Sequence, residues 1–571
     1  MKKILLPLAL IMSSITWSFA QVSFIVLGPD DIIGGYELQY APEGSGSAEW
    51  GVADLALAAN RVVDTLALVD DGSAADSLGC GVLPIGSLTS KIAVVYRGIC
   101  QFGTKALRAQ TAGALAVIII NNVSGPPLGM LSGDDGDEVT IPVIMVSQAT
   151  GVILRNKIDL GIPINALIGN QIGYYVNDLG FTKKNTLVAE AASNLALVSQ
   201  NANEFAVNTG AWIFNYGQND QTGVTLKVEV KLGATVLYTQ TSQAASIDSG
   251  DSLYVSGGVY SAATYASGNY SIDYSIISAN EDYNSNNTAS RPFKIGDKFS
   301  IANLNDSGSF VTTAASQASG SVVGSELKMC IVFKDPNASR LDANGLSFFT
   351  TTRTGVSLID EPVFITAEKW DDEFTGISDP AFDIQLLEEV ASGVYDYAEN
   401  LRGITVSANF DDPFIMEDNQ RYLFCVTSFD SSKFIGTDSD VNYDVNESPL
   451  GSDQPVQMLY TGAWTIGFTD TYPAIILNTT PSVNALNEVA ENKIISYPNP
   501  ANDFITIPLE GFTGKGTLSI TDNVGKLVLN ENVTMGGSLR VNISNMSNGL
   551  YNFSILSNDG KKSSFKVMVS K

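Results

Sequence analysis

The chain has 571 residues, of which 44% are hydrophobic and 16% are charged. This composition is that of folded domains and excludes a largely disordered protein. The net charge of −28 opposes binding to nucleic acids and to anionic membrane surfaces, because both present negative charge. The sequence has no histidine, which excludes Ser-His-Asp and Cys-His catalysis, HExxH zinc peptidases and histidine-ligated metal sites.

The N-terminus predicts a signal peptide over residues 1–20. Lys2 and Lys3 form the basic start, an apolar stretch follows, and a small-x-small cleavage site ends at Ala20, so that the mature chain begins at Gln21. The apolar stretch is too short for a membrane anchor, and no later segment approaches the roughly 20 apolar residues that a span needs. We therefore expect an exported protein without a transmembrane segment.

The first part of the mature chain predicts a small α/β domain. Ile92–Tyr96 and Ala116–Ile120 are nearly continuous runs of β-branched residues, as in strands that are buried on both faces. Lys105–Ala114, between them, is the best helix candidate of the chain. We place this domain at residues 21–175.

From about residue 190 the pattern becomes all-β. Thr225–Leu232 and Tyr270–Ile276 alternate with period two, and clusters of Gly, Asn, Asp and Ser separate such runs. Phe293–Ile295 predicts a closing strand. We expect an immunoglobulin-like sandwich at residues 190–297.

Residues 298–480 predict a larger β-sandwich of no recognised family. Its most strand-like runs, 328–333 and 421–427, carry Cys330 and Cys425 respectively. A disulfide joins the two cysteines if these strands are neighbours, and two separate buried thiols are the alternative. The oxidising compartment expected for an exported protein favours the disulfide.

A polar linker at residues 481–492 precedes a separate module at 493–571. This module has eight basic and five acidic residues, and its net charge of +3 on an acidic chain marks an independent unit. Its period-two runs predict a small antiparallel sandwich. The predicted fold class is therefore mainly β and multidomain, with the α/β domain followed by the immunoglobulin-like, the larger and the C-terminal β-sandwiches.

The C-terminal module resembles the type A (Por) sorting domain of the type IX secretion system of Gram-negative bacteria. It carries Tyr497, Pro498, Asn499 and Pro500 at its start and Phe565–Val569 at its end, in the order and spacing of that family. The family's domain is a label that the outer-membrane exporter reads, and it is commonly removed on export. The resemblance implies the type IX machinery as a partner and delivery through the periplasm to the medium or the cell surface.

The α/β domain resembles the protease-associated (PA) domain. The resemblance rests on Lys91–Phe102, Ala112–Asn122 and Ile141–Ser147. Members of that family are mostly non-catalytic lids or docking modules, so the resemblance implies contact with a peptide or protein. Cys80 and Cys100 fall where the family often has a disulfide, and a bridge around their 19 intervening residues would add about 3 kcal/mol of stability.

The immunoglobulin-like region is similar to bacterial adhesion-related repeats. The similarity rests on Glu281–Asn284 together with Asn286 and Asn287, which precede the last expected strand. It implies a role in adhesion.

Two acidic clusters are candidate calcium sites, and no other cofactor is expected. Solvated loops are the favoured interpretation, because calcium needs 6–8 oxygen ligands and neither cluster has EF-hand spacing. Calcium at one of the clusters stays the alternative. The candidate ligands are Asp134, Asp135 and Asp137 in the first cluster, and Asp438, Asp440 and Asp444 in the second.

Catalytic and sugar-binding patterns are weak. The triplets at 248–250 and 306–308 both read Asp-Ser-Gly, but they lie too close in sequence for the two lobes of an aspartic peptidase, and turns explain them better. Trp370, Trp464 and Tyr460 favour a sandwich core over a sugar-stacking platform.

The sequence therefore predicts an exported, non-catalytic binding or adhesion protein whose PA-like domain contacts its ligand. The ligand is an unidentified peptide, protein or glycan. The alternatives are a secreted hydrolase, a glycosidase rather than a peptidase, or a carbohydrate-binding accessory protein, each with its site in 298–480.

Overall fold

The structure is a computed structural model of the whole chain. The expected cleavage site at Ala20 and Gln21 lies outside the residues that it describes, as do Asp440 and Asp444. No helix among the described residues is long and apolar enough to cross a membrane. The described residues are 22–41, 50–74, 76–123, 125–311, 315–317, 327–352, 355–370, 387–430, 432–438, 456–460, 463–466, 472–482, 494, 496–509, 512, 514–523, 526–557 and 562–571.

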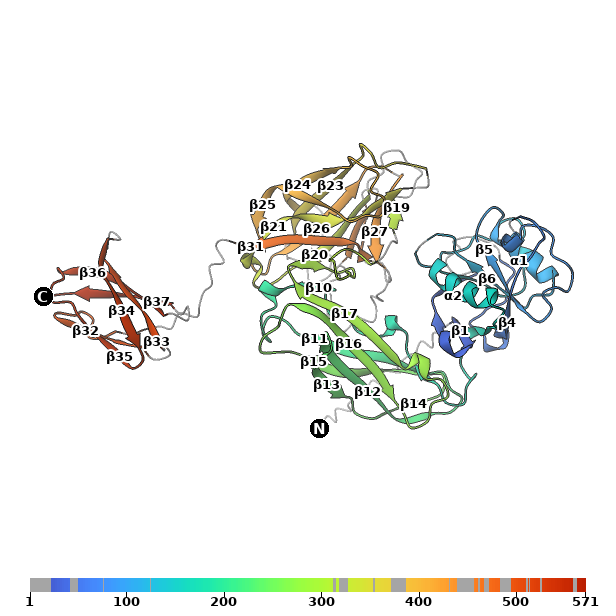
Figure 1. Cartoon of the computed structure of the whole chain (residues 1–571), viewed down its shortest axis with the longest axis horizontal. Coiled ribbons are helices and arrows are strands. Elements are labelled where there is room, and N and C mark those ends of the chain that lie inside the picture. The colour runs from blue at the N-terminus through green and yellow to red at the C-terminus, as the bar shows by residue number, and fades with distance from the viewer. Residues whose placement is uncertain are drawn as a thin grey trace, which may run out of the picture. The chain divides into compact units, whose positions relative to one another are not determined.

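The chain divides into two compact units, Met1–Pro481 and Ser482–Lys571. The first unit begins with an α/β domain built on an eight-stranded sheet with the strand order β2-β1-β8-β4-β5-β6-β7-β3 (Figure 1). Its central strands β4 to β7 pair in parallel. The elements are β1 (Val22–Gly28), β2 (Gly34–Tyr36), β3 (Leu38–Tyr40), β4 (Val62–Leu68), β5 (Ile92–Tyr96), α1 (Phe102–Thr111), β6 (Ala116–Ile120), β7 (Val143–Val146), α2 (Gln148–Asp159) and β8 (Asn165–Asn170).

The two strands predicted in this domain, β5 and β6, have the predicted bounds and are buried almost throughout. Helix α1 lies three residues earlier than the predicted Lys105–Ala114. It ends before Gly113, whose φ of 98° is left-handed and stops a helix. Its first turn extends back to Phe102, and Gln101 and Thr104 on either side of Phe102 donate hydrogen bonds to the loop at 134–138.

The second domain is a β-sandwich with one apolar core, as predicted. A three-stranded sheet, β15-β11-β9, packs on part of a ten-stranded sheet that contains β13-β12-β16-β17. The predicted strands at 225–232 and 270–276 lie within β12 and β16, which pair antiparallel. The main strands are β9 (Leu179–Gly180), β11 (Val207–Asn215), β12 (Gln221–Leu232), β13 (Thr235–Thr241), β15 (Ser252–Tyr260), β16 (Gly268–Ile277) and β17 (Thr288–Gly296).

The ten-stranded sheet continues from the second domain into the third. Strand β10 (Ser193–Leu195) pairs with β17 on one side and with β18 (Lys298–Ser300) on the other. Strand β18 in turn pairs with β31 (Ile475–Pro481) of the third domain. Backbone hydrogen bonds therefore run across the expected boundary at 297–298 (Figure 1).

The third domain is the predicted larger sandwich. Its outer sheet has the order β24-β23-β26-β20-β28-β29, and Cys330 on β20 lies directly opposite Cys425 on β26. The two cysteines form the predicted disulfide, so the alternative of two free thiols is wrong. The main strands are β20 (Leu327–Phe333), β21 (Leu341–Phe348), β22 (Thr350–Thr352), β23 (Pro362–Trp370), β24 (Leu387–Asp396), β25 (Val406–Ile415), β26 (Arg421–Ser428), β27 (Lys433–Asp438), β28 (Val456–Tyr460) and β29 (Ala463–Ile466).

The second unit is the small antiparallel sandwich that the period-two runs predict. A two-stranded sheet, β32-β35, faces a four-stranded sheet, β34-β33-β36-β37, and both contribute to one apolar core. Asn499 ties the Tyr-Pro-Asn-Pro segment to the last strand, because its side chain bonds the backbone of Lys566 and Met568. The strands are β32 (Phe504–Pro508), β33 (Gly514–Thr521), β34 (Leu527–Met535), β35 (Ser538–Asn542), β36 (Gly549–Ser557) and β37 (Lys562–Val569).

Candidate functional site

The connection from β5 to α1 exposes an aliphatic side chain on an unfavourable backbone. Ile99 has a φ of 57°, in the left-handed region that β-branched residues avoid. Its side chain is 88% exposed. Neither the local backbone preference nor contact with water explains an isoleucine here, and residues held in such conformations concentrate at functional sites.

A disulfide holds this connection against a second exposed segment. Cys100, next to Ile99, is bonded to Cys80, with 5.8 Å between their Cα atoms. The segment after Cys80 carries Val82 and Ile85, which are 84% and 90% exposed. We call Val82, Ile85 and Ile99 the apolar rim. The bridge that the PA-like pattern implies is therefore present, and it joins the two segments of the rim.

A buried lysine lies beneath the disulfide. The side chain of Lys105, on α1, is fully buried, and its Nζ donates to the carbonyl oxygen of Leu78 at 2.6 Å and to Cys80 Sγ at 3.4 Å. Burial lowers the pKa of Lys105 to about 8, although the negative charge of Asp71 opposes the shift. A cation thus contacts one sulfur of the bridge.

Two residues of the first acidic cluster accept hydrogen bonds from the start of α1. Asp134 Oδ2 accepts a hydrogen bond from Gln101 Nε2 at 3.3 Å, and Asp135 Oδ2 accepts one from Thr104 Oγ1 at 2.5 Å. Asp137 lies exposed in the same loop. These contacts give two of the three carboxylates a structural role.

The second acidic cluster is described only at Asp438. This residue is buried, and its Oδ2 accepts bonds from the backbone nitrogen of Asn303 at 2.7 Å and from Asn303 Nδ2 at 3.0 Å. Throughout the part of the chain that the structure describes, no three Asp, Glu or Cys side chains are grouped closely enough to hold a metal ion.

A buried carboxyl group that the sequence analysis missed lies at the start of the second domain. Asp178 is fully buried, and its Oδ1 accepts a bond from Asn286 Nδ2 at 2.9 Å. Burial raises the pKa of Asp178 to about 7, and the charges of Glu281 and Asp282 add to the shift. Burial also raises the pKa of Glu281.

One proton would complete the pair between Asp178 and Asn286. Asp178 Oδ2 and Asn286 Oδ1 are both buried acceptors without a hydrogen-bond partner. A protonated carboxyl group has one donor, so a proton on Oδ2 removes one unpartnered acceptor while Oδ1 keeps the bond from Nδ2. The geometry therefore favours a neutral Asp178, in agreement with the direction of its pKa shift.

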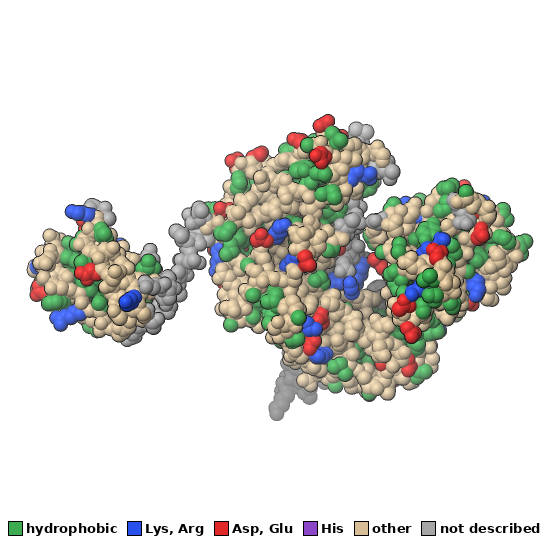
Figure 2. Space-filling view, in the orientation of Figure 1, with side chains coloured by type: hydrophobic (Ala, Val, Ile, Leu, Met, Phe, Trp, Pro, Cys, Tyr) green, Lys and Arg blue, Asp and Glu red, His purple; other side chains and the backbone are tan. Residues whose placement is uncertain are grey.

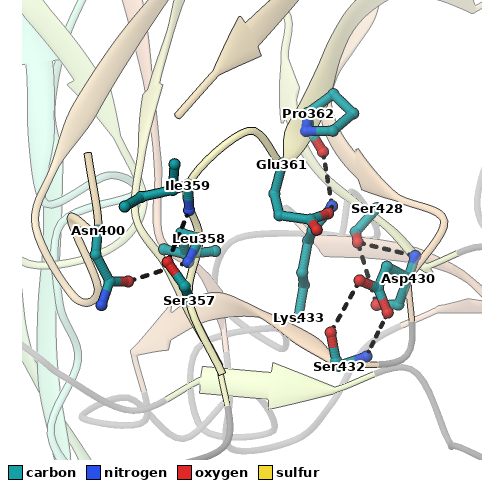
Figure 3. Close-up of polar contacts among 10 residues, drawn as sticks. All are labelled: Ser357, Leu358, Ile359, Glu361, Pro362, Asn400, Ser428, Asp430, Ser432 and Lys433. Carbon is teal, nitrogen blue, oxygen red and sulfur yellow. Dashed lines mark hydrogen bonds and ion pairs between the residues drawn. The ribbon is translucent and has the colours of Figure 1, made fainter. Parts of the chain in front are cut away.

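Polar groups in the loops at one end of the third domain form hydrogen bonds and an ion pair with one another. Figure 3 shows the nearly buried Lys433 Nζ between its two partners, Glu361 Oε2 at 2.8 Å and the carbonyl oxygen of Pro362 at 3.0 Å. Asp430 likewise accepts bonds from the backbone and hydroxyl of Ser432, both at 2.8 Å. These contacts stabilise the loops and leave no convergent set of reactive groups among the ten residues drawn.

Trp370 is a core residue, as the favoured interpretation has it. It is 2% exposed, and the guanidinium of Arg421 lies 5.4 Å from its ring centroid. A buried ring is not available to stack on a sugar. The side chains of Tyr460 and Trp464 lie outside the described residues.

Both Asp-Ser-Gly triplets lie in turns. Gly250 and Gly308 have left-handed φ values of 82° and 75°, which suit the glycine of a turn. The carboxylate of Asp306 accepts a bond from Asn269, whereas Ser249 in the other triplet bonds Asp220 and Gly217. The two triplets thus have separate partners.

Two segments match known domain families. Residues 53–154 match the PA domain, and residues 496–570 match the secretion system C-terminal sorting domain. The chain is a PA-domain protein with a type IX sorting domain. The sorting domain marks it for export to the cell surface or the medium.

The curated relatives match only around the PA domain. A probable leucine aminopeptidase 2 of Aspergillus fumigatus is 34% identical over 100 residues, covering 17% of this chain and 20% of the relative. An ER degradation-enhancing alpha-mannosidase-like protein 3 of Homo sapiens is 34% identical over 94 residues, covering 15% of this chain and 10% of the relative. The chain thus spans a fifth or less of these relatives, which bear the names of different activities.

One solved structure is also similar to part of this chain. An aminopeptidase from Aneurinibacillus sp. strain AM-1 is 22% identical, with a TM-score of 0.19, and the match covers 26% of this chain and 30% of that one.

Proposed function

We propose that the exported protein is a non-catalytic binding protein whose PA domain contacts a peptide or protein segment through the apolar rim. The observation that carries the proposal is Ile99, which is exposed on a left-handed backbone beside a disulfide. Asparagine or glycine would suit both that backbone and water better. Contact with a partner would explain an isoleucine here, because burying its aliphatic side chain contributes about 1.5–3 kcal/mol to the free energy of binding.

A second exposed apolar area on the PA domain supports a contact role. Hydrophobic side chains gather over α2 in Figure 2. Val152 and Ile153 on α2 and Leu160 just beyond it are exposed. Exposed apolar areas of this kind are typical of interaction surfaces. We infer a partner segment that itself presents apolar side chains.

Replacing Ile99 by asparagine is expected to raise the stability of the PA domain and to remove its binding of peptides. Ile99→Asn relieves the left-handed strain, so we expect the unfolding free energy of the PA domain to rise by about 1 kcal/mol. The same variant is expected not to bind the peptides that the wild-type protein selects from a random peptide-display library. Thermal unfolding and direct titration of the selected peptides measure the two effects.

Leu57→Asn is the matched control for this variant. Leu57 is also an exposed aliphatic residue of the PA domain, but its φ of −85° is unstrained. We expect the control to bind the selected peptides as wild type does, without a gain in stability. Equal affinity of wild type and Ile99→Asn for every selected peptide would refute a role for the rim.

We expect the mature chain to cleave neither casein nor its own C-terminal domain. Peptide hydrolysis near pH 7 usually uses a group that exchanges a proton there, and the sequence has no histidine. The test is to incubate the purified mature chain alone and with casein. Cleavage that survives a second purification and disappears with one substitution in this chain would overturn the non-catalytic assignment.

A further inference from the structure

We propose that Cys100 is a thiol-exchange site, at which an exposed thiol replaces Cys80 and becomes covalently attached to the PA domain. The proposal is independent of the proposed binding function, because it concerns the chemistry of the disulfide and not the apolar rim. The class of ligand is a thiol, either on a small molecule or on a protein.

The surroundings of the two sulfur atoms differ. Both cysteines are half-buried, and Cys100 lies between Ile99 and Gln101, which are both exposed. Cys80 follows the buried Gly79 and accepts the 3.4 Å contact from Lys105 Nζ. The two sulfur atoms therefore differ in the charge beside them, and the ammonium group contacts Cys80.

Lys105 makes Cys80 the better leaving group. A neighbouring ammonium group stabilises a thiolate, and a thiol with a lower pKa leaves a disulfide faster. Burial keeps Lys105 in place, and its bond to the Leu78 carbonyl oxygen directs Nζ beside the sulfur. The charged groups that act on Lys105 are Asp71, which favours its protonation, and Arg108, which opposes it.

The reaction is a redox-neutral exchange. The incoming thiol first gives its proton to solvent, and its thiolate then attacks Cys100 Sγ. A bond forms between the incoming sulfur and Cys100 Sγ, while the Cys80–Cys100 bond breaks and its electron pair stays on Cys80 Sγ. The new Cys80 thiolate is held by the Lys105 ammonium. No further oxidant or reductant is needed.

The second disulfide is an internal control. Cys330 and Cys425 are both fully buried in the third domain, so a thiol in solution cannot reach either sulfur in the folded chain. The rate of exchange depends on access to the sulfur. We therefore expect exchange at Cys100 under conditions that leave the Cys330–Cys425 bridge intact.

The experiment treats the whole mature chain with reduced glutathione at pH 7, alkylates free thiols after short times and maps the peptides by mass spectrometry. We expect glutathione on Cys100 and the alkyl group on Cys80, with an adduct ratio of about tenfold or more in favour of Cys100. Equal adducts on the two cysteines, or more on Cys80, would overturn the proposal. This measurement uses wild-type protein and needs no variant to fold.

Two variants and a pH series test the part of Lys105. Lys105→Met is expected to slow exchange about fivefold to tenfold at pH 7, whereas Lys105→Arg retains a cation and most of the rate. Lys91→Met, which removes a cation elsewhere in the domain, is expected to have no effect. The difference between wild type and Lys105→Met should shrink above pH 8, as Lys105 loses its proton. A ratio that stays constant from pH 6 to pH 9 would contradict a role for the ammonium group.

Discussion

Removing residues 493–571 is expected to leave the protein in the periplasm, with extracellular protein reduced to background. The deleted domain matches the secretion system sorting family over nearly its whole length. It also has its own core, so its removal leaves the first unit with a complete core. Fractionation of a bacterium that has the type IX machinery, followed by immunoblotting, measures the distribution of the protein.

A pair of point variants shows whether the exporter needs the folded domain. Phe553 is fully buried and stacks on Phe565 with ring centroids 5.6 Å apart, so Phe553→Ala should cost about 3–5 kcal/mol and unfold a domain of this size. Leu556→Ala, which alters a half-exposed residue of the same strand, is the control and should be exported normally. Normal export of the deletion protein would contradict the sorting assignment.

Asp178→Asn is expected to stabilise the second domain at pH 8 and to change little at about pH 4. Burial raises the pKa of Asp178 in the native state to about 7, from the ordinary aspartate value of 3.8. The native state therefore keeps a proton between about pH 4 and pH 7 that the unfolded chain has lost. The stability that this proton provides is complete below about pH 4, and it is lost as the pH rises through 7.

The expected difference is about 4 kcal/mol at pH 8, since a pKa raised from 3.8 to about 7 corresponds to about 1.4 kcal/mol for each pH unit. Asparagine keeps the acceptor for Asn286 Nδ2 and adds a donor in place of the unpartnered oxygen at every pH. The opening free energies of β11 and β16 from amide hydrogen exchange, corrected for intrinsic rates, measure the effect at each pH. Asp297→Asn, at an exposed position of the same domain, is the control. A pH-independent difference between wild type and Asp178→Asn would show that Asp178 does not bind the proton.

The sequence predicts the fold best where the signal is local. The β-branched runs of β5 and β6 have the predicted bounds, because burial on both faces leaves a continuous apolar pattern. The expected boundary at 297–298 does not interrupt the sheet, since β18 is paired with β31, far along the chain. No local pattern reports such a pairing.

The candidate site was predictable only in part. The resemblance to the PA domain implies the Cys80–Cys100 bridge, but not the strained Ile99 beside it. Lys105 lies in the recognised pattern, yet only the fold shows its side chain buried against a sulfur. Asp178 meets Asn286, 108 residues away, and such a contact arises from tertiary structure alone.

Hydrogen–deuterium exchange of the mature chain, with and without a selected peptide, tests most directly whether the apolar rim of the PA domain binds the partner. The account predicts slower exchange in the segments at 81–86 and 98–102, which carry Val82, Ile85 and Ile99. It predicts unchanged exchange in the described strands of the third domain. Protection confined to residues 298–480, with none at the rim, would contradict the account and place the binding site in the third domain.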